Sequence, residues 1–484
     1  MRNLKKSRWL KQTCSQADTE SASVAVVAAV FVLIAFVAFY RVFLHSLAHV
    51  PGPFLAKLTS LWRDAGYRRG KWHEEILAIH EKYGRVVPIT PNEVSVVDEW
   101  AMKNLYSHGH NALKTPWYSV WDPPQTAPQL FSALDKKEHG FLRKRVSGAY
   151  SMSSILKYEN YIQWTNAFAF DVVGELGYGS QLDMLKTETD VNNLRQNIFD
   201  VFKLLSCMGH FLDQLWILNN AAAAKLLDIL GGAPPLLPFR NRTFKQVQDR
   251  LDHVDEVKRE DMLQHSCRMK DAKGNPVKVE EVVIEAMNLI GAGADTTSIG
   301  MLTYLFYVVS NPDCYRRLQK EVDAFYEDNK LDSPLTMLPS IVFQLLRHTP
   351  PNFTVRGIHI PVGTTIGISP IAQNRDKEIW GPDANKFRPD QWLEDEEKAK
   401  LFESATITFG GSGPRMCVGR NIALAELHKF LGQFVRNFDF EFVNKDQPWT
   451  ITTFWFAYQK NLMMNIKPLL ARVDVHQIIH NWSL

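Results

Sequence analysis

Residues 409–419 read FGGSGPRMCVG, a glycine-rich run that delivers one cysteine, Cys417, immediately before an apolar helical pattern. The apolar residues of that pattern, among them Ile422, Leu427 and Phe434, recur at roughly helical spacing. A thiol at a helix N-terminus lies beside unpaired backbone N–H groups and the positive end of the helix dipole, and Arg415 adds a positive charge. We expect these groups to lower the pKa of Cys417, and we interpret the thiolate as a metal ligand. A free buried cysteine after a flexible loop is the alternative.

The spacing of this run resembles a known haem-ligand signature. Gly413, Arg415, Cys417 and Gly419 match the pattern F-x-x-G-x-R-x-C-x-G of the cytochrome P-450 monooxygenases. The resemblance implies a mainly α fold with a small β region, and haem (heme b) held through the Cys417 thiolate, which pushes electron density toward the iron. Phe409 departs from the pattern because one extra residue separates it from the cysteine. A glycine bulge could absorb that residue.

Composition bounds the class of protein. The chain has 484 residues, of which 45% are hydrophobic, and a formal net charge of +3. This near-neutral charge gives no support for a nucleic-acid partner. The five cysteines are odd in number and scattered, so we expect neither a disulfide framework nor a C-x-x-C metal pair, and a reducing compartment fits best.

The N-terminal region contains an uncharged stretch long enough to span a bilayer as a helix. The basic, aromatic boundary after it favours a retained membrane anchor over a cleaved signal peptide. We predict four segments: a basic or polar segment at 1–20, a transmembrane anchor at 21–41, a proline-rich hinge at 42–60 and a haem-thiolate catalytic domain at 61–484. Basic residues flank both ends of the span about equally, so orientation stays open. The resemblance implies membrane lipid as a partner and a single-pass protein of the endoplasmic reticulum with a cytosolic catalytic domain.

His139 and Arg143 have a spacing of four, which places both side chains on one face of a helix. In the resembled family, residues at this spacing hydrogen-bond a haem propionate, so we assign both to cofactor binding. The alternative is a solvated basic face, because other lysines and arginines crowd the same stretch.

A second motif lies inside the long apolar pattern at 284–309, where residues 292–297 read AGADTT. Glycine and paired threonines are unfavourable inside a helix, so a local reason is needed. By resemblance, Ala292 and Gly293 leave room for oxygen over the haem, and Asp295 and Thr296 relay protons to it as the catalytic pair. A small-residue packing seam between helices is the alternative.

Two features depart from the family pattern. The family has a buried Glu-x-x-Arg pair on a helix, joined by a later arginine; here the structural positions read Gln344, Arg347 and Gln391. The chain also passes from Pro351 to its next landmarks in a few residues, so we expect a pocket-lining strand, with its basic propionate partner, to be missing. Arg356 is a weak substitute. These losses suggest a mis-predicted gene model or a decaying gene, and they predict weakened haem binding.

The sequence therefore predicts a monooxygenase that oxidises a lipophilic small molecule with O2 and with electrons from an NADPH–cytochrome reductase. Its general style resembles microsomal filamentous-fungal members of secondary metabolism. Two alternatives stay open: a catalytically impaired haem-binding remnant or mis-predicted gene model of the same family, and a thiolate-haem isomerase or dehydratase that uses no oxygen. The substrate cannot be read from the sequence.

Overall fold

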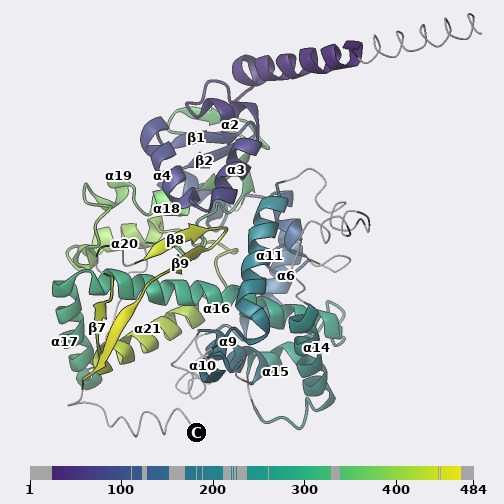
Figure 1. The fold of residues 1–484 in the computed structure, drawn as a ribbon. Helices are drawn as coiled ribbons and strands as arrows, with labels where there is room; N and C mark the ends of the chain where they lie inside the picture. The colour runs from purple at the N-terminus through teal and green to yellow at the C-terminus, as the bar shows by residue number, and fades with distance from the viewer. Residues whose placement is uncertain are drawn as a thin grey trace, which may run out of the picture.

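The computed structural model describes residues 24–110, 112–122, 128–151, 169–180, 182–187, 189–210, 220, 222, 225, 237–259, 261–328, 338–444, 446 and 449–469. Within them the fold is mainly helical with small sheets, as predicted (Figure 1). The helices are α2 Phe54–Leu58, α3 Leu61–Arg69, α4 Trp72–Tyr83, α5 Glu99–Tyr106, α6 Lys136–Ser147, α9 Ala169–Tyr178, α10 Met184–Thr187, α11 Leu194–Met208, α14 Leu237–Asp252, α15 Met262–Cys267, α16 Val279–Val309, α17 Pro312–Asp328, α18 Pro370–Gln373, α19 Lys377–Trp380, α20 Glu396–Ala405 and α21 Arg420–Asn437.

The long helix α16 is the axis of the molecule. It runs for 31 residues without a break, so the AGADTT motif does not interrupt it. Figure 1 shows α16 crossing the centre of the body, with α9, α14 and α21 packed along it. Because apolar residues occur on several of its faces, this helix is buried between other helices rather than lying on the surface.

The strands of the described residues form four small sheets. The strands are β1 Val86–Thr90, β2 Glu93–Val96, β3 Arg347–His348, β4 Phe353–Val355, β5 Ile358–Ile360, β6 Thr365–Ile368, β7 Phe438–Phe442, β8 Thr450–Thr453, β9 Ala457–Lys460 and β10 Met464–Pro468. The largest sheet has the order β1-β2-β6-β3, in which β2 and β6 are parallel and the other pairs antiparallel. Its β1–β2 hairpin confirms the small β region expected beside the helices.

An apolar helix stands apart from the body. Residues Val24–Leu44 form one helix that is long and apolar enough to cross a membrane, and the body buries none of it. Figure 1 shows it projecting away from the sheet region. Its last turn, Tyr40–Leu44, is a π-helix, and the chain enters α2 after Pro53. The predicted basic segment at 1–20 and the start of the anchor lie outside the described residues.

The prediction that Gln344 and Arg347 share a helix is wrong. Residues 338–346 carry no helix, and Arg347 begins strand β3. The preceding segment is held instead by the C-terminal hairpin, because the Val342 N–H donates to the Trp455 carbonyl at 3.0 Å. Gln344 is buried, and both polar atoms of its amide lack a hydrogen-bond partner among the described residues. No hydrogen bond within the described part of the chain joins Gln391 to either residue.

The connection after Pro351 contributes no residue to the wall of the central cavity. The short connection there forms a complete hairpin of β4 and β5, turned by Arg356 and Gly357 at positive φ. The pocket wall comes from the segment before it, where Leu345 and Arg347 line the central cavity. Arg356 lies elsewhere and pairs with Asp98 and Glu378 at 2.7 and 2.9 Å. Arg347 is therefore a basic residue of the cavity wall that comes from the segment before Pro351.

Candidate active site

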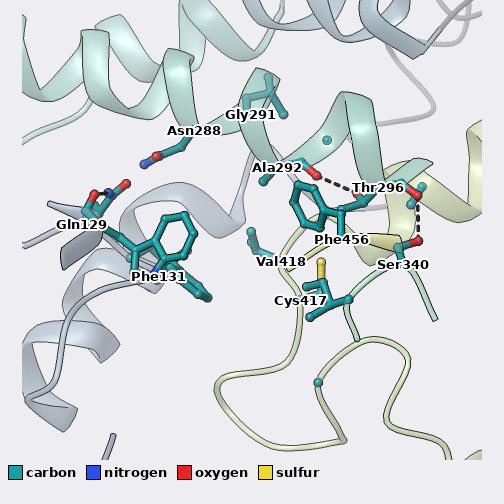
Figure 2. Close-up of a pocket in the computed structure, with 18 of the residues that line it drawn as sticks. Gln129, Phe131, Asn288, Gly291, Ala292, Thr296, Ser340, Cys417, Val418 and Phe456 are labelled. Atoms are coloured by element: carbon teal, nitrogen blue, oxygen red, sulfur yellow. Dashed lines mark hydrogen bonds between the residues drawn. The ribbon is translucent and has the colours of Figure 1, made fainter. Parts of the chain in front are cut away.

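A cavity of about 880 Å³ lies between α16 and the glycine-rich loop that precedes α21. Figure 2 shows Ala292 and Thr296 of α16 on one side and Cys417 on the other, with the sulfur directed into the space between them. Cys417 is the one cysteine of the described residues that lines this cavity. The structure thus brings together the two motifs that lie more than a hundred residues apart in the sequence.

Glycines shape the loop that presents Cys417. Gly410 and Gly411 have φ values of +81° and +83°, a region that only glycine adopts without strain. The Cys417 N–H donates to the Phe409 carbonyl at 2.9 Å and closes the loop. The extra residue is therefore absorbed as a glycine bulge, and Phe409 still lines the cavity. Gly413 has no room for a side chain, because a Cβ there would lie 1.8 Å from the Tyr106 carbonyl oxygen.

The protonation of Cys417 differs from the prediction. Burial raises the pKa of the thiol, and this effect outweighs the backbone N–H groups of Gly419 and Arg420, which lower it. The expected net lowering of the pKa is therefore wrong for the protein groups alone. A thiol in this position ionises when a cation binds at the sulfur, since coordination deprotonates it outright.

The donor set fits an iron that brings its own ligands. Within the described ranges, no group of three or more His, Cys, Asp or Glu side chains is arranged to hold a metal ion. A single thiolate would suit haem, because the porphyrin would supply the other donors that the iron needs. Ala292 and Gly293, which have small side chains or none, line the same cavity as Cys417.

Basic side chains converge at one edge of the cavity. His139 and Arg143 on α6, Arg415 in the loop and Arg347 on β3 all line it. The guanidinium of Arg415 donates to the carbonyls of Ala133 and Leu134 at 2.7 and 3.1 Å. Its Nε and that of Arg347 are buried without a partner among the described residues. This edge therefore fits the two carboxylates of a haem.

The pKa values at this edge reflect its excess of positive charge. Burial, followed by the charge of Arg347, lowers the pKa of Arg415 to about 10. Burial and the charge of Arg415 lower the pKa of His139 to about 3. His139 is consequently neutral near pH 7 and acts through a ring N–H rather than a charge.

Sequence reasoning missed two members of the basic edge: Arg347, to which it gave only a structural role, and Lys114. Lys114 is buried and lines the cavity, and its ammonium donates to the Phe131 carbonyl. Burial and the charge of Arg347 lower its pKa well below the usual value. A backbone bridge pairs Lys114 with Arg347, which carries it to this position. No local motif marks Lys114, so only its isolation in an apolar stretch could have drawn notice.

The distal motif divides between two faces of α16. Thr296 lines the cavity, and its hydroxyl donates to the Ala292 carbonyl at 2.6 Å, while the Ser340 hydroxyl donates to the Thr296 carbonyl at 2.8 Å (Figure 2). Asp295 is buried but is absent from the cavity wall. Burial raises its pKa to about 6, whereas Arg195 and a contact with Tyr458 act in the opposite direction. Asp295 therefore does not line the cavity, although the neighbouring Thr296 does.

A helical body with one cysteine facing a small-residue helix across a cavity, and bases at its edge, defines a haem-thiolate oxidoreductase. The family model for Cytochrome P-450 matches residues 153–471, and the chain belongs to that family. Its members are monooxygenases that bind haem through a cysteine thiolate and use O2, a small-molecule substrate and a redox partner.

The curated relatives are fungal enzymes that align over almost the full length. A cytochrome P-450 monooxygenase of Aspergillus terreus is 30% identical and covers 86% of this chain and 94% of the relative. The cytochrome P-450 monooxygenase cicH of Emericella nidulans is 28% identical, with 89% and 95% covered. A pisatin demethylase of Fusarium vanettenii is 26% identical, with 89% and 90% covered. These relatives support a haem-thiolate monooxygenase of the fungal secondary-metabolite type.

Proposed function

We propose that Cys417 is the axial haem ligand of this monooxygenase and that His139, Arg143, Arg347, Arg415 and Lys114 hold the haem carboxylates. The proposal depends mainly on the cavity, which has the Cys417 sulfur on one wall and Thr296 on the other. Haem bound there supplies the redox chemistry that inserts one oxygen atom into a substrate C–H bond. The protein's own task is to hold that group, exclude water and deliver protons.

The proton route starts from the distal helix. The Thr296 hydroxyl lies on the cavity side and hydrogen-bonds the Ala292 carbonyl, so it can hand a proton to a group bound between α16 and Cys417. Asp295 directly precedes Thr296 and is buried. Burial raises its pKa to about 6, so it exchanges protons near neutral pH. We assign Asp295 as the source of protons and Thr296 as the group that delivers them.

The remaining assignments concern the membrane, the electron donor and the substrate. We propose that Val24–Leu44 anchors the chain once in the endoplasmic reticulum membrane, with the catalytic body in the cytosol. Electrons then come from an NADPH-dependent flavoprotein reductase in the same membrane. The apolar cavity walls favour a lipophilic small molecule, and the fungal relatives favour a secondary-metabolite pathway.

One observation favours a second candidate, a haem-binding chain without turnover. Gln344 is buried with an unsatisfied amide, a cost typical of a structure that has lost a partner. A turnover assay with NADPH, reductase and O2 separates the two candidates, because only the enzyme forms an oxygenated product.

The test of ligation compares two cysteine variants. We expect the reduced, carbon-monoxide-bound protein to show the Soret band of a thiolate-ligated haem, and Cys417→Ser to abolish it. Cys314→Ser is the control, since Cys314 lies on α17 outside the cavity wall. Retention of the thiolate-type band by Cys417→Ser would refute the assignment.

A further inference from the structure

A pair of amide side chains faces the part of the cavity beyond the haem-binding walls. Gln129 and Asn288 line the cavity, and Figure 2 shows the Gln129 carbonyl oxygen directed toward the Asn288 amide nitrogen. Asn288 belongs to a stripe on α16 that continues through Ala292 to Thr296 at intervals of four residues, so all three face the same side.

Hydrogen bonding fixes the orientation of Gln129. Its Nε2 donates to the Trp121 carbonyl at 2.6 Å, and a carbonyl accepts only from a donor, so Oε1 must be the atom that faces the cavity. Its backbone N–H donates to Ser132 Oγ at 3.0 Å and to Asp122 Oδ1 at 3.2 Å. Gln129 is therefore held at its backbone and at its side-chain nitrogen.

The side-chain oxygen of Gln129 lacks a hydrogen-bond donor among the described residues. Oε1 is buried and accepts no hydrogen bond from the described residues. A buried acceptor without a donor costs free energy, which a ligand that supplies the donor recovers. Asn288 is likewise without a hydrogen bond among the described residues, and its amide nitrogen can donate. A single hydroxyl group satisfies both residues, because it donates to Gln129 and accepts from Asn288.

Aromatic rings form the walls beside these amides. Phe131 and Phe456 lie on either side of the cavity in Figure 2. Phe131 is 37% exposed, and its ring meets those of Tyr118 and Trp121 at steep angles, with centroids 5.2 and 5.8 Å away. The Lys114 ammonium lies over the Phe131 ring, 4.9 Å from its centroid. An aromatic ring that lines a cavity offers a surface on which a planar aromatic ligand stacks.

Hydrogen-bond acceptors line this end of the cavity. Gln129 Oε1 is an acceptor, and the Asp122 carboxylate also lines the wall beside it. Both favour a ligand group that donates a hydrogen bond, such as a hydroxyl. Asn288 lies eight residues before Thr296, a rise of ~12 Å at ~1.5 Å per residue. A hydroxyl bound at Gln129 therefore places the opposite end of a fused aromatic ring system near Thr296.

We propose that this monooxygenase takes a neutral, hydroxylated polycyclic aromatic substrate, whose hydroxyl group is bound by Gln129 and Asn288 and whose far ring is oxidised beside Thr296. The inference rests on the proposed function of the same cavity and adds the substrate class and two specificity-determining residues to it.

Three probes separate the two hydrogen bonds: 2-naphthol, 2-methoxynaphthalene and naphthalene. The methyl ether keeps an acceptor but loses the donor, and naphthalene has neither. Measured by titration calorimetry on the purified protein, we expect wild-type affinity to fall about 10-fold at each step. Gln129→Leu should make 2-naphthol and its methyl ether equivalent. Asn288→Leu should make the methyl ether and naphthalene equivalent.

Control variants and a control ligand show whether a change in affinity comes from the cavity residues or from misfolding. Asn104→Leu makes the same substitution on α5, away from the cavity. The ratios of affinity among the three probes should therefore stay at wild-type values in this variant. Asn288→Leu, on the cavity face of a long helix, also tests the proposal if loss of the Trp121 contact unfolds Gln129→Leu. Decahydro-2-naphthol should bind about 10-fold more weakly than 2-naphthol, because it cannot stack.

Equal affinity of the wild type for 2-naphthol and its methyl ether would overturn the proposal, as would ratios unchanged in both cavity variants. Calorimetry does not depend on the state of the iron, so the carbon monoxide spectrum is a separate readout. Selective binding without a thiolate-type band would refute Cys417 ligation and support the substrate class. A band without selectivity would do the reverse.

Discussion

The Arg347 guanidinium donates a hydrogen bond to the Tyr118 hydroxyl at 2.7 Å, which holds it at the basic edge of the cavity. The Arg347 guanidinium also lies 4.8 Å from the Tyr106 ring centroid, within the range of a cation–π contact. Arg347 thus has partners other than Gln344, which stands where the family has the acid of its Glu-x-x-Arg pair. Because Arg347 lines the cavity, a basic side chain is present at this edge, which removes one reason for expecting weakened haem binding.

Replacing Arg347 should therefore loosen haem. We expect Arg347→Leu to transfer haem to apomyoglobin about 10-fold faster than wild type, because a charge-assisted contact to a carboxylate is lost. Arg356→Leu removes the same group from the β4–β5 turn, where its partners are Asp98 and Glu378. Equal transfer rates for the two variants would show that Arg347 does not contact the haem.

Thr296 should control how efficiently electrons become product. Thr296→Val preserves shape and removes the hydroxyl, so product formed per NADPH oxidised should fall by at least roughly 10-fold while hydrogen peroxide rises. Ser298→Ala is the matched control, because the Ser298 hydroxyl bonds the Asp295 carbonyl and does not line the cavity. Full coupling in Thr296→Val would remove Thr296 from the proton route.

Gly413 should be intolerant of any side chain. A Cβ at this position meets the Tyr106 carbonyl oxygen at 1.8 Å, so Gly413→Ala must displace backbone and should cost at least ~3 kcal/mol of unfolding free energy. At Gly140 on α6, a Cβ would meet no atom within 4 Å, and Gly140→Ala should stabilise by about 0.5–1 kcal/mol. Urea unfolding of both variants tests the contrast, and a Gly413→Ala protein as stable as wild type would contradict the packing.

Glu426 should make stability depend on pH. This residue on α21 is buried, and burial raises its pKa from 4.5 to about 8, while Thr297 has a smaller, lowering effect. The folded state therefore holds the proton more tightly than the unfolded state. Its contribution to stability is complete below pH 4.5 and is lost as the pH rises through about 8.

The test is the pH profile of urea unfolding. Between about pH 5 and about pH 9, wild type should lose on the order of 4 kcal/mol relative to Glu426→Gln, which has no proton to lose. Glu403→Gln exchanges the same groups at a side chain that is 74% exposed, and its profile should overlay that of wild type. Parallel profiles for wild type and Glu426→Gln would show that Glu426 does not stay protonated in the fold.

Much of the site could be predicted because its motifs are local. The run around Cys417 and the AGADTT segment each lie within a few residues of an element end or on one helix, and the four-residue spacing of His139 and Arg143 is a property of a single helix. The β1–β2 hairpin follows from β-branched runs for the same reason. Where the position of a residue follows from the helix or strand that carries it, the periodicity of that element is enough to predict it.

The sequence by itself determined the haem-thiolate class and the apolar N-terminal helix, because these depend on short patterns, and it implied through the family resemblance that Cys417 faces the distal helix. Only the tertiary structure decided the roles of Arg347, Lys114 and Gln129. Arg347 lies on a strand of two residues, too short to show a period, and its place is set by pairing with β6 further along the chain. Gln129 reaches the cavity from a connecting segment through contacts with Trp121 and Ser132. Burial, which reverses the expected pKa shift of Cys417, is likewise a sum over distant segments that no local pattern contains.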